Sequence, residues 1–101
     1  MVSALMMTSP EEPLVIPQSR AQEIRDMIAS AWSDITEQNG TEPTLYDHEH
    51  EGQPEGHWSI AWEGGPEEWA IMVADRWTPP EGVGWEADTS FRLNLYPTTG
   101  N

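Results

Sequence analysis

Apolar side chains recur at spacings of three and four in one N-terminal segment, which is the pattern of an amphipathic helix. Ser19 and Gln22 have the spacing of a capping box at its start. Asn39-Gly40 is typical of a helix end, because glycine adopts the left-handed conformation at little cost. We therefore predict one helix over residues 19–38, whose buried stripe consists of Ala21, Ile24, Met27, Ile28, Ala31 and Ile35.

After residue 41 the apolar and polar positions alternate, which is typical of strands with one buried face. Residues 57–63 and 68–74 are predicted to pair as a hairpin, joined by a turn at residues 64–67. This register would place the large apolar side chains on one face, with Trp62 opposite Trp69, Ile60 opposite Ile71 and Trp58 opposite Val73.

Three further segments alternate in the same way. Residues 44–50 form the first, and the second starts at Trp85 and is predicted to bend near Asp88. Residues 78–84, which contain two consecutive prolines, are predicted to be a loop. The last strand carries Phe91, Leu93 and Leu95 on one side and Arg92, Asn94 and Tyr96 on the other.

These elements predict an α+β fold in one domain. Residues 14–16 lie between two prolines that disfavour helix, so residues 1–17 are predicted to be an extended N-terminal arm. Residues 18–101 are predicted to be a single domain, in which one amphipathic helix packs on an antiparallel sheet of three to five strands. The tryptophans of the predicted hairpin are interpreted as core, whereas Trp77 and Trp85 flank the loop and are interpreted as surface contacts.

The composition is strongly acidic. Eighteen aspartates and glutamates oppose four arginines, and the 101-residue chain carries a net charge of −14. Such a charge disfavours nucleic acids and anionic membranes as ligands and favours a protein partner with a basic surface. The absence of cysteine excludes disulfides and thiolate metal sites and favours a reducing compartment. No segment is typical of a signal peptide or a membrane span, so a cytoplasmic location is expected.

The closing stretch GVGWEADTSFRLNLYP resembles the C-terminal end of small uncharacterised acidic proteins of actinobacteria and their phages. In those proteins a short acidic segment precedes a short segment of alternating apolar and polar residues, which ends in Leu-Tyr. The resemblance implies a protein that works in the cytoplasm of a bacterial host cell, and it implies no activity, cofactor or catalytic residue.

We interpret the protein as a non-enzymatic binding module. Its serines lie in no nucleophile motif, its glycines form no phosphate-binding loop, and no cofactor is expected. Carboxylates on a folded surface can imitate a row of phosphates, so a phage-encoded inhibitor that mimics nucleic acid on a host protein is one form of this hypothesis. The residues predicted to contact the partner are Glu63, Glu67, Glu68, Asp75, Trp77, Glu81, Trp85, Glu86 and Asp88.

Two alternatives remain open. The first is a structural component of a phage particle, in which the N-terminal arm reaches a neighbouring subunit, and self-association of the chain also stays open. The second is a metal- or pH-responsive module through His48, His50 and His57. A hairpin closed by residues 51–56 would place His57 opposite His50, but the spacing matches no specific metal motif and metal binding is not expected.

Overall fold

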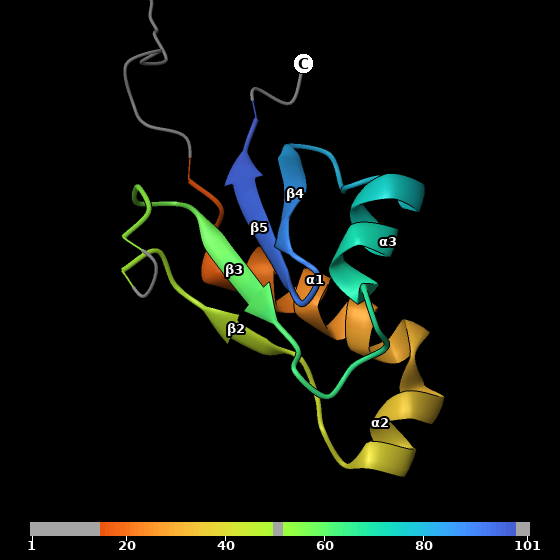
Figure 1. Cartoon of the computed structure of the whole chain (residues 1–101). Coiled ribbons are helices and arrows are strands. Elements are labelled where there is room, and N and C mark those ends of the chain that lie inside the picture. The colour runs from red at the N-terminus through yellow and green to blue at the C-terminus, as the bar shows by residue number, and fades with distance from the viewer. Residues whose placement is uncertain (1–14, 50–51, 99–101) are drawn as a thin grey trace, which may run out of the picture.

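The computed structural model describes residues 15–49 and 52–98, and these residues form an antiparallel four-stranded sheet with three helices (Figure 1). The strands lie in the order β2-β3-β5-β4. The predicted α+β class, with helix packed on antiparallel sheet, is confirmed. The elements are α1 (Gln18–Ala31), α2 (Ser33–Asn39), β2 (Thr44–Tyr46), β3 (Trp58–Ala61), α3 (Trp69–Arg76), β4 (Val83–Thr89) and β5 (Arg92–Pro97).

One face of the sheet forms the core with α1 and α3. In the central pair of strands, Ile60 lies opposite Leu93 and Trp58 opposite Leu95. Because side chains alternate along a strand, these four side chains share one face, and both leucines are fully buried. β3 and β4 both run antiparallel to β5, so α3 connects two parallel strands across β5. In Figure 1, α1 passes behind the sheet and α3 lies beside β4.

The predicted single helix over residues 19–38 is two helices in the structure. Trp32 interrupts it with a non-helical backbone, φ −120° and ψ 44°, and α2 then ends at Gly40, whose φ of 68° is the predicted left-handed stop. The predicted capping box is wrong, because α1 begins at Gln18 after Pro17 and no side chain caps it. Ala21, Ile24 and Ile28 are buried as expected, whereas Met27 is exposed.

The second strand of the predicted hairpin is wrong, because residues 69–76 form α3. The alternation of Trp69, Ile71 and Val73 fits a strand, but the same segment also places Trp69, Val73 and Trp77 at helical spacing. The helix buries Trp69 and Val73 and leaves Ile71 43% exposed, so Ile71 is not the core partner of Ile60. The Trp58–Val73 and Trp62–Trp69 strand pairings fail for the same reason.

Other predictions for the β region agree with the structure only in part. The predicted loop over residues 78–84 is shorter, because β4 begins at Val83. β4 contains Trp85, and its register against β5 shifts between Ala87 and Thr89, which is the predicted bend near Asp88. Phe91 is not in a strand but in the turn between β4 and β5, where it is 37% exposed. The predicted strand over residues 44–50 is shorter, because β2 ends at Tyr46.

Most of the predicted N-terminal arm, residues 1–14, lies outside the described residues. Its last part docks on the domain, where Ile16 is 2% exposed and belongs to the core. The Ile16 amide donates to the Gly56 carbonyl at 3.1 Å, and the Trp58 indole Nε1 donates to the Ile16 carbonyl at 2.8 Å. In residues 15–49 and 52–98, no helix has the length and apolar character needed to cross a membrane.

Candidate functional site

The second face of the sheet is not covered by a helix in the described part of the chain (Figure 1). We call it the open face. Its side chains alternate with those of the core along each strand, so the pairing of the strands places them together. They are Thr44, Tyr46, Ser59, Ala61, Glu86, Arg92, Asn94 and Tyr96.

Hydrogen bonds and close packing order the centre of the open face. The Ser59 hydroxyl, which is 1% exposed, donates to Asn94 Oδ1 at 2.9 Å and accepts from Gln53 Nε2 at 3.3 Å. Tyr96 lies opposite Gly84, and a Cβ at Gly84 would come within 2.3 Å of the Tyr96 ring. The tyrosine therefore packs directly on glycine backbone, as aromatic side chains do at glycines in sheets.

Substitution of Gly84 tests this packing. We expect Gly84→Ala to destabilise the protein by about 1–3 kcal/mol, because the methyl group displaces the Tyr96 ring. Chemical denaturation of the single variants and of Gly84→Ala/Tyr96→Ala gives the coupling between the two positions. If Gly84→Ala costs the same with and without the tyrosine ring, the steric explanation is contradicted.

Two adjoining hollows cross one end of the open face, and together we call them the cross-strand trough. The larger, of about 460 Å³, is lined by Ala61, Glu63, Thr89, Phe91 and Arg92. The smaller, of about 260 Å³, shares Ala61 and Glu63 and extends to β2, where its lining includes Thr41, Glu42, Thr44 and Tyr46. The trough thus joins segments that are about half the sequence apart and belong to β2, β3 and the β4–β5 turn.

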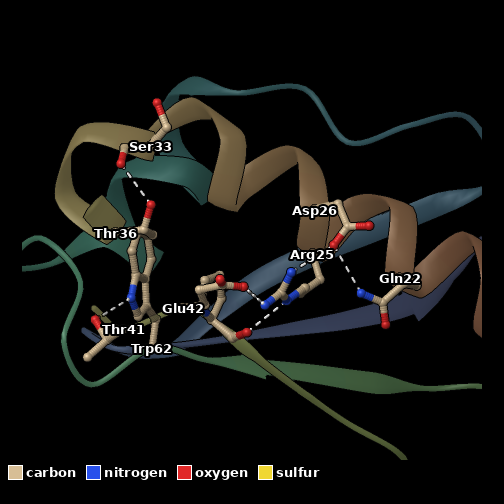
Figure 2. Close-up of polar contacts among 9 residues, drawn as sticks. Gln22, Arg25, Asp26, Ser33, Thr36, Thr41, Glu42 and Trp62 are labelled. Atoms are coloured by element: carbon tan, nitrogen blue, oxygen red, sulfur yellow. Dashed lines mark hydrogen bonds and ion pairs between the residues drawn. The ribbon is translucent and has the colours of Figure 1, made fainter. Parts of the chain in front are cut away.

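The wall of the smaller hollow is held by contacts with the core (Figure 2). The Trp62 indole Nε1 donates to Thr41 Oγ1 at 3.3 Å, and Asn39 Nδ2 donates to the Gly64 carbonyl at 3.2 Å. A Cβ at Gly64 would meet Thr41 Oγ1 at 2.3 Å, so the two segments approach as closely as glycine allows. The lining is therefore ordered before any ligand arrives.

An ion-pair network fixes Glu42 at the rim of this hollow (Figure 2). Arg25 donates to Glu42, to Asp26 at 2.8 Å and, through Nε, to the Pro43 carbonyl at 2.8 Å. Hydrogen bonds from Arg25 and then from Gln22 lower the pKa of Asp26. Burial alone would lower the pKa of Arg25, but its hydrogen bonds to Glu42 and Asp26 outweigh that effect and raise it. Arg25 thus partly neutralises Glu42, whereas Glu63 takes part in no ion pair among the described residues.

Acidic side chains lie only on the surface of the described structure. Three of the eighteen, Glu11, Glu12 and Glu51, are outside the described residues, and the other fifteen are all exposed. Exposure of these carboxylates is favourable for long-range attraction of a cationic partner.

The structure places the predicted contact residues, expected on the edge of a hairpin and in loops, in two groups. Glu63 lies in the trough and Glu86 on the open face, with Asp88 at the β4 bulge. The other group surrounds α3 and consists of Glu67, Glu68, Asp75 and Glu81. Glu68 is the residue before α3 and has a left-handed backbone with φ 61°.

The two predicted aromatic anchors differ in position. The expected surface position of Trp85 is wrong, because its side chain is 7% exposed and faces the core between Val83 and Ala87. Trp77 is half-buried and stacks on Trp32 with ring centroids 5.1 Å apart and an interplanar angle of 17°. Trp77 therefore connects the end of α3 to the α1–α2 junction, and part of its ring remains accessible.

The histidines do not form a metal site in the described residues. His48 and His57 lie outside β2 and β3, and His50 lies outside the described residues, so its predicted pairing with His57 is not addressed. His48 Nδ1 is 3.2 Å from the Gln53 carbonyl, which occupies one ring nitrogen. No group of three histidine, cysteine or acidic side chains within residues 15–49 and 52–98 is arranged to hold a metal ion.

We predict that the protein retains no stoichiometric zinc through gel filtration, because His48 and His57, the two histidines within the described residues, belong to no group arranged to hold a metal ion. Metal analysis of the eluted protein is the measurement, with His48→Ala/His50→Ala as the matched variant. One zinc ion per chain that is lost in this variant would contradict the prediction.

Sequence reasoning did not identify most residues of the trough. The sequence pattern places Tyr46, Phe91 and Arg92 on strands without assigning them a role, and it does not single out Glu42 as a contact residue. The alternation of the last strand did carry one usable signal, because it placed Arg92 on the face opposite Leu93. Comparison of the chain with protein-family models, curated proteins and solved structures found no match in any of the three.

Proposed function

We propose that this protein is a non-enzymatic binding module that docks on a basic protein surface through the open face of its sheet. One observation carries the proposal: the face that no helix covers in the described residues presents carboxylates at the trough and on β4. These are Glu42, Glu63 and Glu86. Complementary charge accelerates association and suppresses wrong partners, so it suits a module whose role is recognition.

The order of the face supports this role. The contacts of Ser59 and Tyr96 hold the open face in one arrangement before binding, which reduces the conformational entropy lost on association. The net charge of −14 extends the attraction of these side chains for a cationic partner beyond direct contact.

A finer form of the proposal is nucleic-acid mimicry. In this form the partner is a nucleic-acid-binding protein of a bacterial host, and the carboxylates occupy the positions of phosphates on its basic surface. The same proposal places the protein in the bacterial cytoplasm, as an inhibitor that displaces nucleic acid without binding it.

Capture from a bacterial lysate at two salt concentrations tests the proposal. We expect a basic protein to bind the immobilised chain at about 0.05 M salt and to be released at about 0.5 M, where the screening length is about threefold shorter. Trp62→Ala/Trp69→Ala is the matched control, because it removes two core side chains and preserves the charge of −14.

Equal capture by the native and the core-disrupted chain would show that net charge alone attracts the protein, and this result would contradict the proposal. Capture that is unchanged at high salt would contradict it as well, because contacts between exposed charges weaken as salt screens them.

A further inference from the structure

The smaller hollow of the trough has a polarity that matches one kind of side chain. Its floor is formed by Ala61 and Thr44, which are small and lie opposite each other on β3 and β2. Glu42 and Glu63 line it beyond the end of this pair, and Tyr46 lines it on the other side of Thr44. The hollow therefore has an anionic end, a small uncharged floor and an aromatic end.

We infer that this hollow receives an arginine side chain of the protein partner, an inference that rests on the proposed function. The guanidinium lies between the carboxylates, the aliphatic stem covers Ala61 and Thr44, and Tyr46 packs on the segment that carries the arginine. Arginine suits this arrangement because its planar guanidinium presents several donors to carboxylate oxygens, while its stem is apolar.

The charges around the hollow favour a single cation. Arg25 uses only Oε1 of Glu42, and Glu63 forms no ion pair in the described structure, so acceptors are available at this end. Arg92 lines the adjoining hollow and makes a second cation unfavourable there. The smaller hollow thus suits a single basic side chain of the partner's basic surface.

Titration of the full-length chain with Nα-acetyl-arginine amide tests this inference by two-dimensional NMR of the backbone amides. We expect binding in the millimolar range, as is usual for a small fragment. The shifts should concentrate at Tyr46, Ala61 and Glu63. Nα-acetyl-citrulline amide has nearly the same shape without the charge, and it should cause no comparable shifts.

Two variants locate the effect. Glu63→Gln is expected to weaken arginine binding about tenfold or more, whereas Glu67→Gln, which removes the same charge at the turn before α3, should bind as the native chain does. Both side chains are exposed, so neither substitution should alter the circular dichroism spectrum. Equal effects of the two variants, or equal shifts with citrulline, would overturn the inference.

The outcomes separate this inference from the proposed function. If Glu63→Gln loses the arginine titration and also loses the salt-sensitive partner, both stand. If the partner binds Glu63→Gln as tightly as the native chain, the proposed function stands and the arginine site is overturned. If arginine binds but no partner shows salt-sensitive capture, the arginine site stands and the proposed function fails.

Discussion

Replacement of Trp62 by alanine is expected to destabilise the protein by about 3–5 kcal/mol, the usual cost of removing a large buried aromatic side chain. Trp62 is 1% exposed and makes edge-on contact with Trp69, with ring centroids 5.8 Å apart. The ring centroid of Trp32 lies 5.9 Å from that of Trp62, and a Cβ at Gly65 would fall within 2.5 Å of the Trp62 ring. The alanine variant therefore leaves a cavity that neighbouring helices and the following loop cannot easily fill.

Urea denaturation measures this loss against two comparison variants. Trp77→Ala should cost clearly less, about 1–2 kcal/mol, because its ring is half-buried and loses mainly the stack on Trp32. Ile71→Ala should change the free energy of unfolding by less than about 0.5 kcal/mol, because Ile71 is exposed on α3.

The Ile71 variant also distinguishes the two interpretations of residues 68–74. In a hairpin with Ile71 opposite Ile60, its truncation would cost about as much as other buried isoleucines, 2–5 kcal/mol. A loss of that size would contradict α3. If Trp62→Ala is too unstable to give a baseline, Trp62→Phe is expected to show a smaller loss in the same direction.

The position of the carboxylates is expected to matter more for binding than their number. The double reversal Glu63→Lys/Glu86→Lys places two cations on the open face, and Glu67→Lys/Glu68→Lys places two at the turn before α3. Both variants change the net charge by the same amount from −14. We expect the first to weaken binding to the captured partner about a hundredfold or more, through lost attraction and new repulsion, and the second to weaken it about tenfold or less.

Competition with nucleic acid provides the measurement. The native chain should displace DNA or RNA from the partner at about 0.05 M salt and lose most of this ability at about 0.5 M. Glu63→Lys/Glu86→Lys should not displace it at either concentration. A partner that keeps its nucleic acid in place while it binds the protein would exclude mimicry, although it would leave a binding role intact.

The opposite ranking of the two variants would be equally informative. A larger loss for Glu67→Lys/Glu68→Lys would place the contact surface around α3, together with Asp75, Glu81 and the accessible part of Trp77. Reversal at Glu67 and Glu68 should cost little stability, about 0.3–1 kcal/mol each, because they lose only a favourable position near the N-terminus of α3.

Local periodicity was sufficient to predict several elements of this protein. The stripe of Ala21, Ile24 and Ile28 predicted a helix that packs on one face, and these residues are buried in α1. Alternation likewise predicted that Leu93 and Leu95 share one side of the last strand, and both are buried in the core. Both predictions hold because a repeat of 3.6 or of two residues assigns side chains to a face without reference to the rest of the chain.

Tertiary packing decided the elements whose local pattern was ambiguous. The segment from Trp69 to Trp77 fits both repeats, and it becomes a helix where Trp69 contacts Trp62 and the Ala70 amide donates to the Ser90 carbonyl at 3.2 Å. Pro66 and the following acidic pair are typical of a helix start and were a usable signal for α3. The break at Trp32 has no such signal, and it brings the Trp32 ring against both Trp62 and Trp77.

The sequence by itself determined the sign of the surface charge, since its acidic excess is independent of the fold. It could not place the trough, because Glu42, Glu63 and Arg92 come together only when β3 pairs with β2 on one side and β5 on the other. Pairing between strands that are distant in sequence depends on the packing of the whole core, and a local pattern contains no information about it. For this reason the charge of the candidate site follows from composition, whereas its shape follows only from the tertiary structure.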